Sequence, residues 1–221
     1  MNYLTYQLLN FEELEILRKS LETEELLWED GRKTAGKQAA KVKNNLQLRR
    51  DSDLSKKFSG LIAKKILSNE LIKSFALPKI IHGTIFSKST IGMKYGRHID
   101  NAYMSSGRAD LSFTIFLNSN KNYEGGALSI ENLNVEEKFR LDAGEIIIYP
   151  STYIHSVEEV TNGERLVFIG WIESYVKSIE EREYLFDLDA AAKSLLAKYG
   201  RSDEVDLIFK SYSNLLRRLG S

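Results

Sequence analysis

Two histidines and one aspartate have the residue types and the spacing of a metal site. His98 and Asp100 stand two positions apart in the stretch IGMKYGRHIDN, residues 91–101. Side chains alternate between the two faces of a strand, so this spacing places an imidazole and a carboxylate on the same side of the backbone. His155 can add a third ligand from a distant strand. Two histidines and one carboxylate form the facial triad that holds Fe(II) and leaves coordination positions open.

Arg165 follows His155 by ten positions. The Asn162-Gly163 pair between them is typical of a two-residue hairpin turn, so we expect the strand of His155 to turn there and bring Arg165 to the same cavity. A guanidinium can grip a carboxylate with two parallel hydrogen bonds, which a lysine cannot do in the same geometry. Taken alone, Arg165 is better explained by a surface salt bridge. Beside three metal ligands, it indicates a site for an anionic cosubstrate.

Few other side chains can bind a metal, because the chain has no cysteine and only three histidines. Disulfides, thiolate metal sites and a cysteine nucleophile are excluded, and every metal ligand must be His, Asp or Glu. The third histidine, His82, stands among apolar residues in IIHGTIF. This setting is more typical of a structural side chain than of a ligand.

Length and charge limit the partners. The 221 residues can form one domain, and the 31 basic and 31 acidic residues give no net field toward nucleic acid or an acidic membrane. No stretch is long and apolar enough for a membrane span, and the acidic N-terminal residues do not fit a signal peptide. We therefore expect a cytoplasmic protein that recognises any anionic ligand locally.

The elements that position these residues follow from hydrophobic periodicity. Helical patterns cover residues 11–27, 54–67, 69–76, 178–199 and 203–219. Between Lys79 and Glu173, seven short β-rich runs alternate with turn signals and no crossover helix interrupts them. Such strands form an antiparallel sandwich or jelly roll. We expect a mainly β fold with flanking helices in one domain, 1–221, made of helical support (1–78), a jelly-roll catalytic core (79–174) and C-terminal helices (175–221), which can also mediate a homo-oligomer.

The basic, glycine-containing segment of residues 31–45 has two interpretations. A charge run usually faces water, which favours a solvated loop, but a loop of this kind can also form a wall that meets a substrate. An anionic or amide-rich ligand fits its side chains better than an apolar one does. The candidate substrate contacts are Lys37, Gln38, Lys43 and Asn45 within the segment, with Asn101 and Arg108 outside it.

Several motifs together resemble the Fe(II)/2-oxoglutarate dioxygenases related to prolyl 4-hydroxylase, and among them the PKHD-type hydroxylases. They are DGRKTAGKQAAKVKNNLQL (30–48), GRHIDNA (96–102), DLSFTIFLN with YEGGALSIE (110–131), and GEIIIYPSTYIHSVEEVTNGERLVFIGWIES (144–174). LFDLDAA (185–191) and NLLRRLG (214–220) extend the resemblance over nearly the whole chain.

This resemblance implies a double-stranded β-helix fold, with Fe(II) on His98, Asp100 and His155 and the distal carboxylate of 2-oxoglutarate on Arg165. Trp171 resembles a wall of the cosubstrate pocket, with plain core packing as the alternative, and Tyr95 is a further cosubstrate contact. Enzymes of this kind consume O₂, release succinate and CO₂, and hydroxylate an unactivated C–H bond, with ascorbate as a possible reductant. The implied substrate is a peptidyl proline or a small molecule.

Three positions refine the comparison with the family. Close relatives usually carry a tyrosine nine residues before the first metal histidine, where this chain has Ser89. Either Lys88, Tyr95 or a water takes over its role, or the cosubstrate is held more weakly. Retention of Asp100 favours hydroxylation over halogenation. Relatives that demethylate nucleic acid usually have a second arginine where this chain has Trp171, which disfavours a DNA or RNA substrate. The competing hypothesis is a non-catalytic jelly-roll module with a structural metal such as zinc, although such sites are normally closed by four protein ligands.

Overall fold

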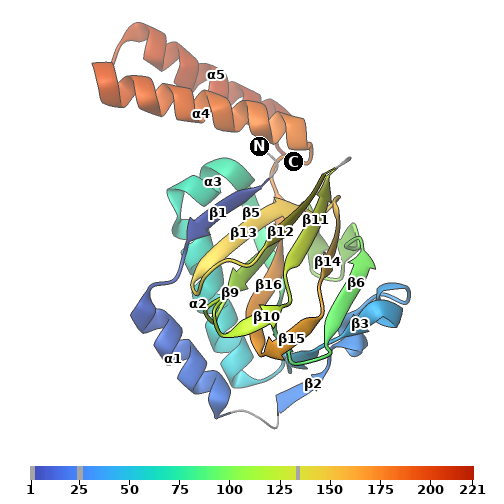
Figure 1. Ribbon diagram of the computed structural model, residues 1–221. Helices are drawn as coiled ribbons and strands as arrows, with labels where there is room; N and C mark the ends of the chain where they lie inside the picture. The colour runs from blue at the N-terminus through green and yellow to red at the C-terminus, as the bar shows by residue number, and fades with distance from the viewer. Residues whose placement is uncertain (1–2, 24–26, 133–134) are drawn as a thin grey trace.

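The core of the computed structural model, which describes residues 3–23, 27–132 and 135–221, consists of two antiparallel sheets (Figure 1). Every strand pairing in this part of the chain is antiparallel. Helices cover the larger sheet, and residues of both sheets line one cavity. The predicted jelly-roll core with flanking helices is confirmed.

The strands of the larger sheet are β1 (Leu4–Gln7), β2 (Trp28–Asp30), β4 (Leu46–Leu48), β5 (Pro78–Ser89), β9 (Leu111–Phe116), β13 (Glu145–Pro150) and β16 (Arg165–Ser174). The smaller sheet contains β3 (Lys43–Asn44), β6 (Lys94–His98), β11 (Leu128–Asn132), β12 (Val135–Phe139) and β14 (Ile154–Val157). Two further pairs are β7 (Tyr103–Met104) with β8 (Gly107–Arg108), and β10 (Tyr123–Gly125) with β15 (Val160–Gly163). The strand orders are β1-β13-β9-β16-β5-β4-β2 and β12-β11-β14-β6-β3.

The two faces of the larger sheet are sorted by the alternation of side chains along each strand. On β16, Leu166 and Phe168 face the helices and pack in a cluster with Phe86 of β5. Arg165 and Val167 on the same strand line the cavity instead. The central strand β9 is buried along its whole length because both of its faces are covered.

The helices are α1 (Phe11–Glu22), α2 (Asp53–Ser68), α3 (Glu70–Ala76), α4 (Ile179–Tyr199) and α5 (Asp203–Leu219). A capping box of Asn10 and Glu13 begins α1, and Ser52 caps α2. The first helix was predicted to reach residue 27, but α1 ends at Glu22. Residues 24–26 of the predicted helix lie outside the described residues. Buried side chains of α2 and α3 form one cluster with the larger sheet and make it a rigid support.

The C-terminal helices α4 and α5 form an antiparallel pair that projects from the sheets (Figure 1). Apolar side chains join this pair to Leu77 and Val176 at its base. Tyr184, Tyr199 and Leu207 are exposed along it. A homo-oligomeric contact through these helices stays a prediction. None of the helices in the described ranges has the length and apolar character required to cross a membrane.

The predicted hairpin at Asn162-Gly163 is wrong. β14, which carries His155, pairs with β11 and β6 in the smaller sheet, whereas β16 pairs with β5 and β9 in the larger one. The Asn-Gly pair ends β15, which pairs with β10 at the edge between the sheets. Gly163 has the positive φ of 72° that a turn glycine can adopt, but Asn162 and Gly163 pair with Glu124 and Tyr123, and the chain then continues into the larger sheet. His155 and Arg165 therefore reach the cavity from opposite walls.

Candidate functional site

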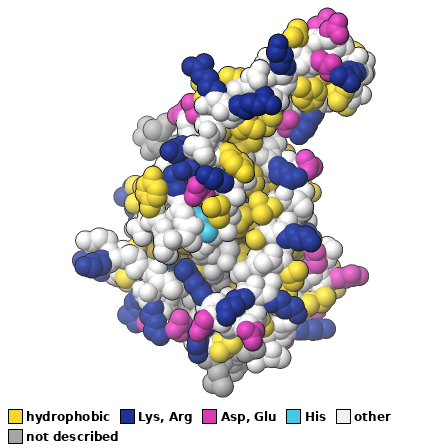
Figure 2. Space-filling model, turned by 180° about the vertical axis from the view of Figure 1, so that it is seen from behind, with side chains coloured by type: hydrophobic (Ala, Val, Ile, Leu, Met, Phe, Trp, Pro, Cys, Tyr) yellow, Lys and Arg dark blue, Asp and Glu magenta, His cyan; other side chains and the backbone are white. Residues whose placement is uncertain are grey.

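The cavity lies between the two sheets and has a volume of about 420 Å³. Residues of β5, β9, β13 and β16 form one wall, residues of β6 and β14 form the other, and the segment 34–50 borders the opening. The surface seen from behind shows one histidine side chain among uncharged and basic side chains (Figure 2). The segment that the sequence left open between loop and wall is thus a wall, built around two short 3₁₀ helices, η2 (Gly31–Thr34) and η3 (Ala39–Val42).

The three predicted metal ligands meet in this cavity. His98 ends β6, Asp100 follows two residues later, and His155 lies on β14 directly opposite His98. Their nearest ligand atoms all lie within 4.8 Å of one another, and His155 Nε2 is 3.7 Å from Asp100 Oδ2. Two imidazoles and a carboxylate at this spacing can hold a divalent ion, and they are the donor set of non-haem iron sites.

The backbone orients both imidazoles toward the centre of this group. The Nδ1 atoms of His98 and His155 lie 2.8 Å and 3.1 Å from the carbonyl oxygens of Gly96 and Tyr153. A carbonyl only accepts, so each Nδ1 carries the proton and each Nε2 keeps a free lone pair for a metal. Burial, together with the neighbouring His155, lowers the pKa of His98 to about 4. His98 is therefore neutral, and able to bind a metal, at neutral pH.

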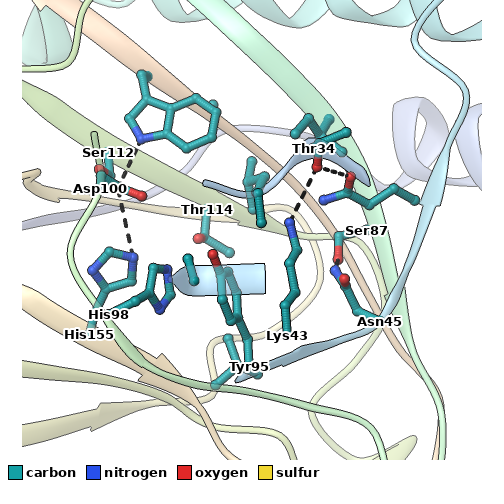
Figure 3. Close-up of a pocket in the computed structure, with 18 of the residues that line it drawn as sticks. Thr34, Lys43, Asn45, Ser87, Tyr95, His98, Asp100, Ser112, Thr114 and His155 are labelled. Carbon is teal, nitrogen blue, oxygen red and sulfur yellow. Dashed lines mark hydrogen bonds and ion pairs between the residues drawn. The ribbon is translucent and has the colours of Figure 1, made fainter. Parts of the chain in front are cut away.

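Asp100 is held by two hydrogen bonds (Figure 3). Ser112 Oγ and Trp171 Nε1 both donate to Asp100 Oδ2, over 2.6 Å and 2.9 Å. Gly83 adopts a left-handed conformation beneath the indole, where a Cβ would come within 2.7 Å of Trp171 Cε3. Trp171 thus lines the cavity, as predicted, but its indole N–H also fixes the third ligand. Neither pocket wall nor core packing, the two interpretations of Trp171 from sequence, included this contact.

Replacing Trp171 with phenylalanine tests this contact. Loss of the indole N–H is expected to weaken metal affinity by about 10–100-fold, which is the usual effect of removing a partner that orients a metal ligand. Mn(II) titration followed by calorimetry measures it. Trp28→Phe is the matched control, because Trp28 packs beside Lys88 away from the cavity. Equal metal affinity in wild type and Trp171→Phe would contradict the orienting role.

Arg165 is a buried cation without a counter-charge. It is only 3% exposed, and it forms no ion pair with any carboxylate in the described ranges. Its Nε has no hydrogen-bond partner there either, and burial lowers the pKa of the guanidinium. The surface salt bridge considered from sequence is therefore wrong. A buried, unpaired guanidinium is stabilised by an anionic ligand, and a carboxylate matches its geometry.

The residues around Arg165 show what stands in place of the missing tyrosine. Ser89 is buried directly opposite Arg165 on β5. Lys88 does not substitute for it, since its Nζ points away to Glu164 and the ring of Trp28. Tyr149 on β13 does line the cavity and is fully buried, and burial raises the pKa of its hydroxyl well above the usual range. Tyr149 therefore remains a hydrogen-bond donor beside the guanidinium.

Tyr95 lines the cavity as predicted, but at the metal ligands. Its ring stacks on His98 with the centroids 3.6 Å apart, and Lys43 Nζ lies 4.9 Å from the centroid of the Tyr95 ring. Burial raises the pKa of Tyr95, and the charge of Asp100 adds to the effect. Sequence reasoning missed Tyr149, because it stands in the continuous apolar run EIIIYP, which gives no indication of which face is which.

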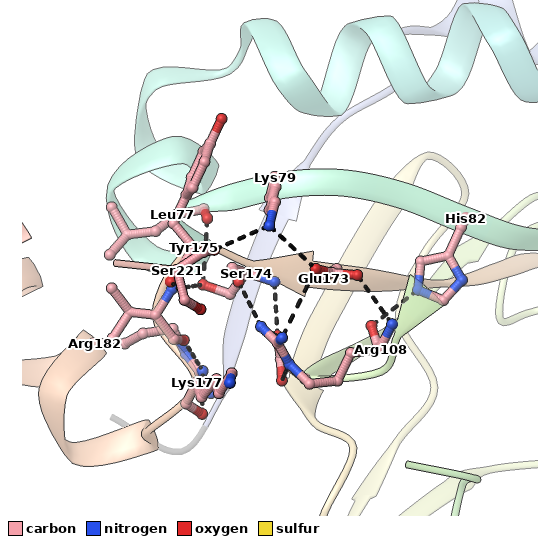
Figure 4. A network of polar contacts seen from close by, with 12 residues as sticks. Leu77, Lys79, His82, Arg108, Glu173, Ser174, Tyr175, Lys177, Arg182 and Ser221 are labelled. Carbon is pink, nitrogen blue, oxygen red and sulfur yellow. Dashed lines mark hydrogen bonds and ion pairs between the residues drawn. The ribbon is translucent and has the colours of Figure 1, made fainter. Parts of the chain in front are cut away.

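Three of the six predicted substrate contacts line the cavity: Lys43, Asn45 and Asn101. Lys37, Gln38 and Arg108 do not line it. Arg108 Nε lies 2.7 Å from Asp110 Oδ1, and its Nη2 donates to the Ser174 carbonyl over 2.8 Å (Figure 4). Glu173 accepts from its backbone N–H. The prediction for Arg108 is wrong, because these partners lock the guanidinium into the structure.

The same network also explains His82. Its Nε2 lies 3.0 Å from the Arg108 carbonyl oxygen and its Nδ1 lies 3.0 Å from Ser106 Oγ. Both ring nitrogens are occupied within the protein, so the predicted structural role of His82 is confirmed.

Replacing Arg108 with methionine tests the structural role. The change leaves the buried carboxylate of Asp110 without its cation and is expected to lower the free energy of unfolding by about 3 kcal/mol. Urea unfolding measures it. Arg49→Met is the matched control, since Arg49 pairs with Asp51 at the same two-residue spacing but in solvent, and little change is expected. Unchanged stability together with weaker substrate binding in Arg108→Met would instead return Arg108 to the substrate site.

The chain is similar to known proteins along its whole length. Residues 84–173 match the 2OG-Fe(II) oxygenase superfamily, and residues 180–220 match the PKHD-type hydroxylase C-terminal domain. A PKHD-type hydroxylase of Prochlorococcus marinus strain MIT 9215 is 74% identical over 220 residues, covering 100% of both chains. Another, from strain MIT 9515, is 71% identical over 221 residues with the same coverage.

Solved structures show the same fold. A prolyl-4-hydroxylase of Pseudomonas putida matches with a TM-score of 0.58 at 17% identity, over 78% of this chain and 92% of that one. The non-haem α-ketoglutarate-dependent carbocyclase SnoK of nogalamycin biosynthesis matches with a TM-score of 0.60 at 12% identity, over 79% and 81%. The chain therefore belongs to the PKHD-type hydroxylases of the 2OG-Fe(II) oxygenase superfamily, enzymes that use Fe(II), 2-oxoglutarate and O₂.

Proposed function

We propose that His98, Asp100 and His155 hold the catalytic Fe(II) and that Arg165 binds the distal carboxylate of 2-oxoglutarate. One observation carries the proposal: the three ligand atoms converge within 4.8 Å in a cavity that also contains an unpaired, buried guanidinium. The metal group and the cation stand on opposite walls, so an anionic chelator can bridge them.

The protein's own residues perform binding, orientation and exclusion of water. When bound, iron and 2-oxoglutarate supply the oxidation, in which O₂ converts 2-oxoglutarate to succinate and CO₂ and one oxygen atom enters a C–H bond of the substrate. The Nε2 atoms of both histidines and the carboxylate of Asp100 present three ligands on one side and leave the other side open. Val167 and Ile169 line the cavity nearby and limit the access of water.

The competing hypothesis of a structural zinc module is not supported. Structural zinc sites are closed by four protein ligands, whereas the group found in the described ranges contains three. Since Asp100 occupies the third position, no place is free there for a halide, and hydroxylation is the reaction that we propose. The single domain spanning 1–221 is part of the same proposal.

The substrate is proposed to be a peptidyl proline or a small molecule. Similar structures include the prolyl-4-hydroxylase of Pseudomonas putida and a prolyl hydroxylase of Trichoplax adhaerens in complex with a peptide fragment. A nucleic-acid substrate is disfavoured by the balanced charge of the chain. Ascorbate is proposed as the reductant that keeps the iron ferrous. A cytoplasmic location is also proposed, and the absence of cysteine is compatible with it.

Succinate formation tests the proposed function. Purified protein is supplied with Fe(II), ascorbate, 2-oxoglutarate and a panel of prolyl peptides and small metabolites. The expected result is a slow background turnover that rises with one substrate and yields a hydroxylated product in equal amount to succinate. Failure of the protein to bind both Fe(II) and 2-oxoglutarate would overturn the proposal.

A further inference from the structure

The cavity contains a second cationic region, separate from Arg165. Lys43 on β3 is 7% exposed, and its Nζ lies 3.4 Å from Thr34 Oγ1. Arg50 lines the opening beside it, and its guanidinium donates only to the Gly83 carbonyl, over 3.3 Å, among the contacts found in the described ranges. Neither cation forms an ion pair in this part of the chain, although surface lysines and arginines elsewhere on the protein commonly do. Two unpaired cations at one opening form an electropositive wall.

Two buried amides extend this wall, and each has one polar atom without a hydrogen-bond partner in the described ranges. Gln47 is 1% exposed, and its Oε1 accepts from Thr34 Oγ1 while its Nε2 has no hydrogen-bond partner in the described ranges. Asn45 is also buried and donates to Ser87 Oγ over 2.7 Å. An unsatisfied donor buried in a protein is costly and normally has a ligand or water as its partner. Gln47 lines the same cavity as Lys43 and Arg50.

Tyr95 separates this wall from the metal ligands. His98 stacks on Tyr95, and Lys43 lies on the opposite side of that tyrosine in the close-up view (Figure 3). Lys43 and Arg50 thus border the outer part of the cavity, while Arg165 on β16 belongs to the other wall. The two cationic regions can therefore bind two different ligands at once.

When metal and cosubstrate are bound, no negative charge in the cavity, as far as the structure describes the chain, compensates the positive charges of this wall. Asp100 is the one acidic side chain that lines the cavity in the described ranges. Fe(II), Asp100 and the 2-oxoglutarate dianion together carry one negative charge, which Arg165 neutralises. The positive charges of Lys43 and Arg50 then remain. Burial lowers the pKa of Lys43 to about 8, with the charge of Arg50 adding to the effect, so an anion beside Lys43 relieves an existing electrostatic cost.

We propose that the primary substrate carries an anionic oxygen group, a carboxylate or a phosphate, that binds Lys43 and Arg50. This inference rests on the proposed function, because it assigns 2-oxoglutarate to Arg165. The rest of the substrate faces the exposed apolar side chains of Ile99 and Tyr103 at the cavity opening. The anion fixes one end of the substrate, and the C–H bond to be hydroxylated lies toward His98 and His155.

Matched pairs of probes test the proposal on the full chain loaded with Mn(II) and 2-oxoglutarate. Mn(II) takes the place of Fe(II), so the loaded protein binds a probe without turnover. The pairs are N-acetyl-L-proline with N-acetyl-L-prolinamide, and propyl phosphate with 1-propanol; the members of the first pair differ mainly in charge, and those of the second differ by the phosphate group. Calorimetry is expected to show at least about ten-fold tighter binding of one anionic probe than of its neutral partner. The pair that shows the preference identifies the carboxylate or the phosphate as the recognised group.

Variants show which residues cause the preference for the anionic probe. Lys43→Gln and Arg50→Gln are each expected to remove most of it while leaving 2-oxoglutarate affinity unchanged, and Lys41→Gln, an exposed lysine of η3 outside the cavity, is expected to leave it intact. Arg50 is exposed, so its variant remains folded even if Lys43→Gln does not. Equal or undetectable binding of both members of both pairs at millimolar concentration would overturn the proposal. Loss of 2-oxoglutarate affinity in Lys43→Gln would also overturn it by placing Lys43 in the cosubstrate site. A wild type that fails to bind 2-oxoglutarate at all would instead overturn the proposed function.

Discussion

Replacement of His155 by alanine is expected to abolish metal binding and succinate formation. The side chain presents Nε2 to the same point as His98 and Asp100, and no other donor in the described ranges joins that group. Removing a partner that only orients a ligand typically costs 10–100-fold in metal affinity, so removal of a ligand itself is expected to cost more than about 100-fold. Calorimetric titration with Mn(II) measures the affinity, and a succinate assay with Fe(II) measures the activity.

His82→Gln is the matched control for this experiment. His82 is also a buried histidine, but both of its ring nitrogens are occupied by Ser106 and Arg108. The control is expected to bind metal as the wild type does, even if it is less stable. Metal affinity that falls equally in His82→Gln and His155→Ala would show a general loss of structure. Metal affinity that survives in His155→Ala would contradict the assignment of the ligands.

Arg165→Met is expected to abolish productive binding of 2-oxoglutarate while metal binding persists. Truncating one partner of a buried, hydrogen-bonded charge pair costs about 2–5 kcal/mol, which corresponds to at least about thirty-fold weaker affinity. Methionine keeps the length and apolar character of the side chain, so the core around Phe116 and Val167 stays filled. Anaerobic titration of the Fe(II) protein with 2-oxoglutarate, followed by its charge-transfer absorbance, measures the affinity.

Two further variants sharpen the result for Arg165. Arg165→Lys keeps the charge but cannot form two parallel hydrogen bonds, so an affinity between those of wild type and Arg165→Met is expected. Lys88→Met, on the neighbouring strand but facing Glu164 outside the cavity, is expected to have no effect. Wild-type 2-oxoglutarate affinity in Arg165→Met would show that another cation, with Lys43 as the first candidate, binds the cosubstrate.

The metal group and the helices could be predicted from sequence because each depends on local rules. His98 ends β6 and Asp100 follows two residues later, and Asn10 with Glu13 forms a capping box within four residues. Sheet pairing depends on distant partners, which local turn chemistry does not specify. Asn162 and Gly163 do end a strand, but that strand pairs with β10 and carries the chain from one sheet to the other.

Arg108 and Tyr149 show two other limits of sequence reasoning. Arg108 and Asp110 stand two positions apart with opposite charges, and the structure joins them in an ion pair. The type of the residue alone does not distinguish this ion pair from a substrate contact. Tyr149 stands in a run of apolar residues covered on both faces, where periodicity carries no information about direction.

Position 89, where this chain has a serine in place of the family's tyrosine, has another tyrosine nearby. Ser89 stands opposite Arg165, and Tyr149 supplies a buried hydroxyl from the neighbouring part of the sheet. We propose that the departure leaves the cation in place and changes the donor beside it. A cosubstrate carboxylate bound by Arg165 is expected to accept from Tyr149 as well.

A crystal structure with Mn(II) and 2-oxoglutarate tests the central claim most directly. The predicted result is one ion on His98 Nε2, His155 Nε2 and the Asp100 carboxylate, chelated by 2-oxoglutarate, with the distal carboxylate on Arg165 and the outer wall of Lys43 and Arg50 still free. A fourth protein ligand on the ion, or a distal carboxylate bound by Lys43 in place of Arg165, would contradict it.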